Sequence, residues 1–320
     1  MSISAPDGAR PPVLLYACFG VDPAIWEREI RRLAPTLDLR LWPETGDPAE
    51  IDYVLTWNAP RGFWQGFPNL KAIFSLGAGV DKLLTDPELP TDIPLVRMVD
   101  PGLAAGMKEF VLMRVLHYHR HMPEFAAQQA ATEWRQLRAP PAAERLVGIM
   151  GLGELGETCA RMLAELGFAV SGWSRRKKEI QGVATYAGTE ELGAFLAASE
   201  ILVCLLPLTA DTENLLNATV FARLPRGAYV INVARGAHLV EQDLLEALAT
   251  GQIAGATLDV FRVEPLPPDH PFWAHPAITV VPHVSALTQP QTAAKVLLDN
   301  LSAHAQGAAL RHLVDRGSGY

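Results

Sequence analysis

Residues 147–168 read VGIMGLGELGETCARMLAELGF, and this stretch decides the fold. An apolar run is followed by a GxGxxG pattern and then by a helix-like pattern that ends at Gly167. A strand, a glycine turn and a helix in this order begin the βαβ unit of a dinucleotide-binding Rossmann domain. Gly151 permits the tight turn, Gly153 lets the backbone approach a pyrophosphate, and Gly156 lets the helix and strand pack closely. The loop residues predicted to bind the cofactor, at the N–H groups of the helix start, are Gly151, Leu152, Gly153, Glu154, Leu155 and Gly156.

A basic loop follows the next strand. NAD-binding Rossmann units usually carry an acidic residue here, about 20 residues after the glycines, to accept the ribose hydroxyls. This chain instead reads Trp173, Ser174, Arg175, Arg176, Lys177 and Lys178. A guanidinium binds a 2′-phosphate through paired charge-assisted hydrogen bonds, whereas a carboxylate would repel it. The loop therefore favours NADPH over NAD, with Trp173 and an arginine sandwiching the adenine. The alternative is a solvated basic loop.

Two series of short apolar runs alternate with helix-length amphipathic segments, a pattern typical of parallel sheets covered by helices. The first series starts at Val13 and the second at Leu146; a long helical pattern from Ala105 lies between them. We expect a last helix, from Gln289 to about Ala305, to pack back on the first series. The sequence thus predicts an α/β fold with two doubly wound parallel-sheet domains. Their predicted boundaries are residues 1–104 plus 286–320 for the first, discontinuous domain and residues 105–285 for the Rossmann domain.

Composition excludes several classes of protein. The net charge of −8 argues against a nucleic-acid partner, and no apolar run approaches the ~18 residues needed to span a membrane. Cys18, Cys159 and Cys204 lie in apolar runs, which is typical of buried free thiols in a reducing compartment, so we expect a cytoplasmic protein. His117 and His121 form an HxxxH pair on the expected helix, but no third ligand is evident, so no metal site is predicted.

Polar residues follow three later strands of the second series. Arg235 lies in NVARGAHL, Asp259 and Glu264 lie in LDVFRVEPLP, and His283 lies in VPHVSALT. Open α/β sheets bind ligands at the carboxyl ends of their strands. A cation, carboxylates and a titratable imidazole at neighbouring strand ends therefore indicate an active site. Ser285 lies close to the imidazole, but the chain has no GxSxG elbow of the kind that hydrolases use.

These motifs in this order resemble the D-isomer-specific 2-hydroxyacid dehydrogenases, and most closely the glyoxylate/hydroxypyruvate reductase branch. The segments that carry the resemblance are GLGELG, WSRR, NVARGAHLVEQDLLEAL, LDVFRVEPLP and PHVSALT, with FSLGAGVDKLL from Phe74 also in keeping. The resemblance covers nearly the whole chain. It implies a flavodoxin-like substrate domain, a Rossmann domain, an active site between them, and a homodimer joined by the arm around Trp134.

The resemblance also implies roles for single residues. Arg235 would bind the carboxylate and keto oxygen of a 2-oxo acid, His283 would be the general acid, and Glu264 would be its partner. The residue chemistry agrees, because hydride delivered to a carbonyl carbon leaves charge on the oxygen, where a protonated imidazole serves as acid. A guanidinium fork holds a carboxylate bidentately. Asp259 resembles the family residue that meets the nicotinamide carboxamide. The further cofactor contacts implied are Leu206, Pro207, Val233, Ala234, Arg235, His283 and Ser285.

The first domain offers its own candidates. The loop Leu76, Gly77, Ala78 and Gly79 would add backbone N–H donors that form an anion-binding nest for the substrate carboxylate. The alternative is an ordinary glycine turn. Trp57 ends an apolar strand, and the sequence is compatible with two roles for it, a wall of the substrate pocket or a core side chain.

Two classes of function remain. The leading hypothesis is an NADPH-dependent reductase that converts glyoxylate to glycolate and hydroxypyruvate to D-glycerate. The alternatives are a dinucleotide-sensing binding protein on the same fold and another 2-hydroxyacid dehydrogenase, such as a phosphoglycerate dehydrogenase. The basic cofactor loop and the lack of a C-terminal regulatory extension argue against the last of these.

Overall fold

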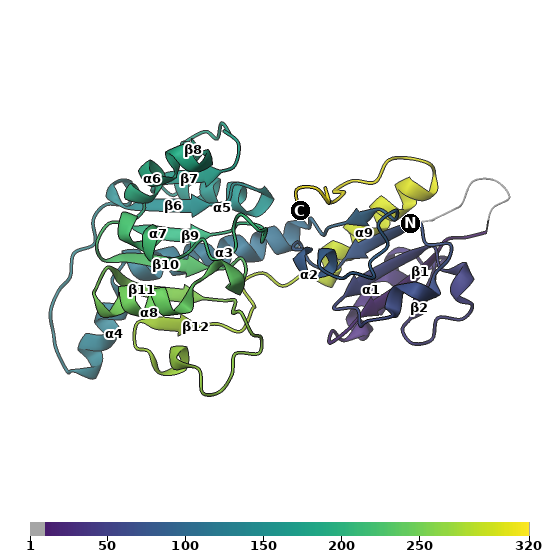
Figure 1. Ribbon diagram of the computed structural model, residues 1–320, viewed down its shortest axis with the longest axis horizontal. Helices are drawn as coiled ribbons and strands as arrows, with labels where there is room; N and C mark the ends of the chain where they lie inside the picture. The colour runs from purple at the N-terminus through teal and green to yellow at the C-terminus, as the bar shows by residue number, and fades with distance from the viewer. Residues whose placement is uncertain (1–9, 320) are drawn as a thin grey trace. The chain divides into compact units, whose positions relative to one another are not determined.

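The computed structural model describes residues 10–319, which divide into two compact units (Figure 1). One unit takes the chain up to Leu103 and from Thr288 onward, and the other takes Ala104–Leu287. Helix α3 (Pro101–His119) begins in the first unit and continues into the second. Its start is fixed by Asp100, whose side chain accepts a hydrogen bond from the N–H of Leu103 at 3.0 Å, with a proline as the first helical residue.

The first unit contains a five-stranded parallel sheet in the order β2-β1-β3-β4-β5, the flavodoxin-like order. The strands are β1 (Val13–Cys18), β2 (Asp38–Leu41), β3 (Tyr53–Trp57), β4 (Ala72–Ser75) and β5 (Leu95–Val96). The helices are α1 (Pro23–Leu33), α2 (Asp81–Leu84) and α9 (Pro290–Ala305), with the 3-10 turns η1 (Pro48–Glu50) and η2 (Phe63–Gly66). All six residues of β1 are buried because alternate side chains enter the two cores on opposite faces of the sheet. The helix expected near the C-terminus is thus present, and it packs in the first unit.

The second unit contains a seven-stranded parallel sheet in the order β12-β11-β10-β9-β6-β7-β8. The strands are β6 (Leu146–Met150), β7 (Ala169–Ser174), β8 (Val183–Ala187), β9 (Ile201–Cys204), β10 (Ala228–Asn232), β11 (Ile253–Leu258) and β12 (Ile278–Val280). The helices are α4 (Met122–Ala130), α5 (Glu154–Glu165), α6 (Gly188–Ala197), α7 (Ala218–Arg223) and α8 (Glu241–Ala249), with the 3-10 turns η3 (Ala142–Glu144), η4 (Gly236–His238) and η5 (Pro271–Ala274). Helices α3 and α5 share one core with the sheet, and α6, α7 and α8 share the core on its other face. The predicted fold class, two doubly wound parallel sheets, is confirmed.

Three details differ from the expectations or complete them. The edge strand β8 was not predicted, because its residues are only partly buried and give no apolar run. The expectation that His117 and His121 lie on one helix was wrong, because α3 ends at His119 and His121 lies in the following turn with a φ of 59°. Cys18, Cys159 and Cys204 are buried free thiols, and burial raises the pKa of Cys159 and of Cys204 to about 12. In residues 10–319 no helix is long and apolar enough to cross a membrane.

Candidate active site

The glycine loop at the start of α5 has an open side. A Cβ on Gly156 would lie 1.7 Å from the carbonyl oxygen of Gly151, so this glycine is required by the fold. Gly151 has a φ of 106°, a backbone conformation that other residues rarely adopt. Gly153 is the N-cap residue of α5, and a Cβ there would meet no atom within 4 Å. The loop therefore leaves space directly before the N-terminus of a helix, which fits the pyrophosphate of a dinucleotide.

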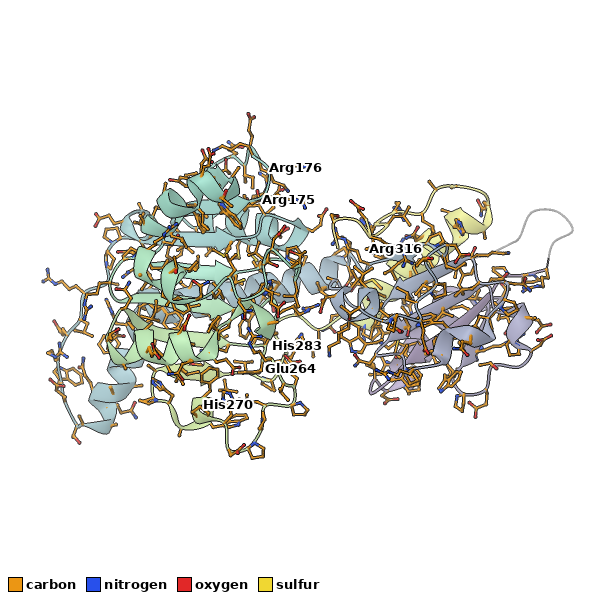
Figure 2. The ribbon with its side chains drawn as sticks, in the orientation of Figure 1. Arg175, Arg176, Glu264, His270, His283 and Arg316 are labelled. Carbon is orange, nitrogen blue, oxygen red and sulfur yellow. The ribbon has the colours of Figure 1, made fainter. Side chains whose placement is uncertain are left out.

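The basic loop follows β7. This strand comes next in the chain after β6 and the glycine loop, and it pairs with β6 in the sheet. Lys177 forms an ion pair with Glu191 at 3.1 Å, and Lys178 forms one with Glu157 at 3.3 Å. Arg175 and Arg176 are exposed at the end of the strand (Figure 2), and the hydroxyl of Ser174 donates to the carbonyl of Arg176 at 2.7 Å. Acidic side chains of the same unit thus pair with the lysines, and the two arginines follow β7 directly, where the sequence analysis expects the 2′-phosphate.

Trp173 corrects one expectation. Only 8% of the residue is exposed, it packs in the core of the sheet, and its indole N–H donates to the carbonyl of Gly188 at 2.8 Å. The ring is therefore a core side chain and not one side of an adenine sandwich. Its carbonyl accepts a hydrogen bond from the N–H of Gly151 at 2.8 Å, so Trp173 instead ties the end of β7 to the glycine loop.

His283 and Glu264 form a pair at the ends of two neighbouring strands, β12 and β11 (Figure 2). The Nδ1 atom of His283 lies 2.8 Å from Oε2 of Glu264. The other carboxylate oxygen accepts a hydrogen bond from the N–H of Phe261 at 2.9 Å, which fixes the glutamate. The side chain of His283 is 43% exposed. Because Nδ1 faces the carboxylate, the Nε2 edge is the one that remains for a substrate.

Asp259 holds the turn that carries this histidine. The aspartate is fully buried, and its oxygens accept hydrogen bonds from the N–H groups of Val284 at 2.8 Å and Ser285 at 3.1 Å. Its own carbonyl accepts from the N–H of His283 at 2.9 Å. Burial raises the pKa of the Asp259 carboxyl, while the hydrogen bonds from Ser285 and Val284 act in the opposite direction. The sequence pointed to a cofactor contact, and the structure adds this anchoring role, which fixes the backbone at His283.

Arg235 follows β10 and is partly buried. Its backbone is held by two fully buried side chains that the sequence analysis missed, Asn232 and His238. The side-chain amide of Asn232 donates to the carbonyl of Arg235 at 3.0 Å, and Nδ1 of His238 accepts from its N–H at 3.2 Å. The Nε2 atom of His238 lies 3.3 Å from the carbonyl of Pro207, in the loop after β9. Each could have been found as a polar residue in an apolar segment: Asn232 ends the strand AYVIN (228–232), and His238 lies in GAHLV (236–240).

The first unit places Trp57 against its glycine loop. A Cβ on Gly77 would lie 2.6 Å from Cζ3 of Trp57, so the glycine is required because the indole covers it. The N–H of Leu76 cannot serve in the expected anion-binding nest, since it already donates to the carbonyl of Thr56 at 2.9 Å. Among residues 10–319, the N–H groups of Ala78 and Gly79 have no acceptor. The donors that the loop offers to an anion are therefore these two.

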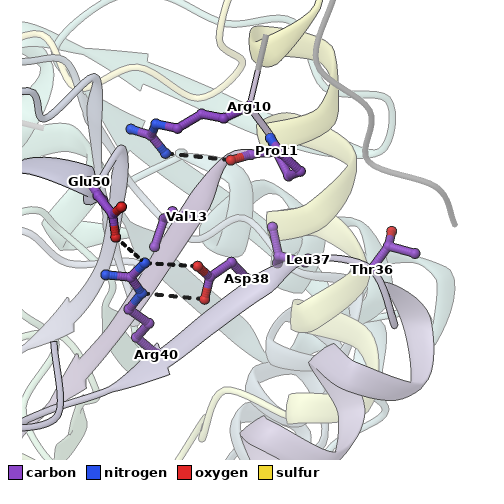
Figure 3. Close-up of a pocket in the computed structure, with 8 residues that line it drawn as sticks. All are labelled: Arg10, Pro11, Val13, Thr36, Leu37, Asp38, Arg40 and Glu50. Atoms are coloured by element: carbon purple, nitrogen blue, oxygen red, sulfur yellow. Dashed lines mark hydrogen bonds and ion pairs between the residues drawn. The ribbon is translucent and has the colours of Figure 1, made fainter. Parts of the chain in front are cut away.

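One pocket of the first unit lies elsewhere (Figure 3). Its charged groups are paired with one another: Arg40 forms ion pairs with Asp38 at 2.9 Å and with Glu50 at 2.6 Å. Arg10 pairs with Asp52 at 2.8 Å. Two arginines and two carboxylates line the pocket, so their charges balance and leave no net charge to bind an ionic ligand.

Residues 112–285 match the family model of the D-isomer specific 2-hydroxyacid dehydrogenase, NAD binding domain. The chain belongs to this family. A glyoxylate/hydroxypyruvate reductase A from Yersinia enterocolitica is 43% identical over 300 residues, which cover 92% of this chain and 96% of the relative. The resemblance to the glyoxylate/hydroxypyruvate reductase branch is thereby confirmed.

Solved structures of this dehydrogenase family agree along the whole chain. An enzyme of the family from Xanthobacter autotrophicus, crystallised with NADPH and MES, is 42% identical with a TM-score of 0.94, and the match covers 97% of this chain and all of that one. An NADPH-dependent glyoxylate/hydroxypyruvate reductase from Sinorhizobium meliloti, in complex with NADP and sulfate, is 40% identical with a TM-score of 0.91 over 97% of this chain and 100% of that one.

Proposed function

We propose that this dehydrogenase reduces glyoxylate to glycolate and hydroxypyruvate to D-glycerate with NADPH. The observation that carries the proposal is the His283–Glu264 pair, which lies at the same edge of one sheet as Arg235 and the glycine loop. An acid, a carboxylate-binding cation and a dinucleotide cradle are the parts that reduction of a 2-oxo acid needs. The names of the relatives specify the same substrates and cofactor.

The glycine loop and the N-terminus of α5 would hold the pyrophosphate, and Arg175 with Arg176 and Ser174 would hold the 2′-phosphate. When it is bound, NADPH supplies a hydride to the carbonyl carbon. The remaining residues of the proposed cofactor site follow strand ends of the same sheet. They are Leu206 and Pro207 after β9, Val233 and Ala234 after β10, and Asp259 and Ser285.

This chain's own side chains would bind the substrate and supply the proton. The guanidinium of Arg235 holds the substrate carboxylate and orients the carbonyl. In the other unit, the backbone N–H groups of Ala78 and Gly79, with Trp57 beside them, would offer donors to an anion. His283, protonated, donates the proton on Nε2 to the carbonyl oxygen as negative charge develops there. Glu264, whose carboxylate lies 2.8 Å from Nδ1, keeps the ring oriented.

The test is turnover. Purified protein should oxidise NADPH, followed by the loss of its absorbance, when glyoxylate or hydroxypyruvate is added, and NADH should be a poorer cofactor. A panel of 2-oxo acids at fixed NADPH ranks the substrates. Stoichiometric NADPH binding without turnover of any of them would favour the sensing protein instead. A preference for phosphohydroxypyruvate would favour the phosphoglycerate dehydrogenase.

The proposal also assigns roles to the two units and an oligomeric state to the protein. The unit Ala104–Leu287 would be the cofactor domain and the other unit the substrate domain. The active protein would be a homodimer in the cytoplasm, where its thiols stay reduced. The segment 131–141, without helix or strand, runs along the outside of the second unit and exposes 94% of Trp134 (Figure 1). Light scattering of wild type and Trp134→Ala tests this arm, because loss of the contact should yield monomers.

A further inference from the structure

Arg262 lies two residues before Glu264 and bonds to the segment that follows Arg235. Its Nε and Nη2 atoms donate to the carbonyl of Leu239 at 3.0 and 2.8 Å. Nη2 also donates to the carbonyl of Ala237 at 3.2 Å and to the side-chain oxygen of Asn214. One guanidinium thus serves carbonyl groups that few other side chains could satisfy together, because it presents several donors in a rigid plane.

The two backbone segments touch at the same place. A Cβ on Gly236 would lie 1.9 Å from the carbonyl carbon of Phe261 and 2.4 Å from the backbone nitrogen of Arg262. No side chain separates the segments, so a shift of one moves the other. The N–H of Phe261 donates to Glu264 at 2.9 Å, and Glu264 in turn lies against His283. Contacts therefore run without a break from the proton donor to the residue beside the substrate-binding arginine.

We propose that Arg262 is a positioning residue, which fixes the Arg235 backbone relative to the Glu264–His283 pair. The inference rests on the proposed roles of Arg235 and His283 in reduction. Arg262 acts on the substrate only through Arg235, by holding residues 237–239 in place. Displacement of a substrate-binding group by about 1 Å costs on the order of 10²-fold in rate. A guanidinium that merely stabilised a surface loop would affect unfolding and not this alignment.

The experiment compares Arg262→Met and Arg262→Lys with a matched control. Arg226 donates to the carbonyl of Thr250 at 2.7 Å in the same unit, but at the opposite end of β10, so Arg226→Met removes an equivalent bond. We expect Arg262→Met to lower kcat/KM for glyoxylate by about 10- to 100-fold, with the KM for NADPH unchanged. Arg262→Lys, which keeps one donor group, should recover part of the loss. Arg226→Met should keep wild-type kinetics.

A double-mutant cycle with Arg235→Gln decides how Arg262 acts. If Arg262 works through Arg235, its replacement costs little once Arg235 is gone, and the two effects are not additive. Full additivity overturns the proposal, as does an Arg262→Met protein with normal glyoxylate kinetics and only a lower Tm. Should Arg262→Met fail to fold, the lysine variant carries the same cycle. An Arg235→Gln protein that retains full turnover would instead refute the proposed role of Arg235, whatever Arg262 does.

Discussion

The glycine loop and the His283–Glu264 pair lie at the same edge of the seven-stranded sheet, but they are built in different ways. The loop is one continuous stretch, Gly151–Gly156, in which backbone geometry leaves space before the N-terminus of α5. The pair joins two separate loops through side chains, and a third segment brings Arg235. A site built from backbone depends on the conformations and close approaches that glycine permits. A site built from side chains depends on the contacts that keep each loop in place. Asp259 and Arg262 are the residues that do this holding.

The largest effect should come from the side-chain site. Replacing His283 with alanine removes the proposed proton donor, so the reductive rate should fall by ~10²- to 10⁴-fold while NADPH affinity changes little. Steady-state kinetics and a cofactor titration measure the two. His270→Ala is the matched control, since that histidine pairs with Glu241 at 3.3 Å in the same unit but outside the proposed site (Figure 2). Near-normal turnover of the His283 variant would remove this residue from the mechanism.

The second prediction tests whether the basic loop after β7 selects NADPH over NADH. Arg175→Ala removes a charge-assisted hydrogen bond worth ~1.5 to 3 kcal/mol, so NADPH should bind roughly 10- to 150-fold more weakly. NADH, which lacks the 2′-phosphate, should be unaffected. Lys177→Ala is the control, because Lys177 already pairs with Glu191. The Michaelis constants for both cofactors check this. Equal weakening of NADPH and NADH, or a wild type that prefers NADH, would show the arginines to be a solvated loop.

The pH profile sharpens the role of the pair. Reduction takes up a proton, which we propose that His283 donates, so the reductive rate should fall as pH rises. Oxidation of the hydroxy acid releases a proton, so its rate should rise over the same range. Rates in both directions across one buffer series measure the two limbs. Parallel limbs would assign the proton to another group.

Two glycines of the same loop should separate fold from binding. Gly156→Ala places a methyl group 1.7 Å from the Gly151 carbonyl oxygen, so we expect the free energy of unfolding to fall by about 1–3 kcal/mol. Gly153→Ala meets no protein atom within 4 Å, so stability should hold while NADPH binds about tenfold more weakly. Urea unfolding and cofactor titration distinguish the variants. Unchanged binding in Gly153→Ala would mean that the pyrophosphate does not approach this backbone.

Much of the site could be read from the chain because its signals are local. The glycine loop is contained in one strand, turn and helix, and the basic loop follows the next strand directly. Arg235, Glu264 and His283 each follow an apolar strand, which puts them at the binding edge of any parallel sheet. What failed depended on the surroundings. Strand β8 is half exposed, His121 leaves its helix through a left-handed turn, and the N–H of Leu76 is taken by a neighbouring strand.

By itself the sequence determined the order of the helices and of the strands other than β8, the positions of the glycines and the kinds of side chain proposed for catalysis. Hydrophobic period and backbone sterics act over a few residues, so these features are visible locally. Only the tertiary structure decided that Trp173 belongs to the core, that Asp259 holds the turn behind His283, and that Arg262 and His238 hold the Arg235 segment. These roles depend on which strands become neighbours. A buried polar group must find its partner wherever the sheet order brings one within hydrogen-bond distance, and that partner can be far away in the chain.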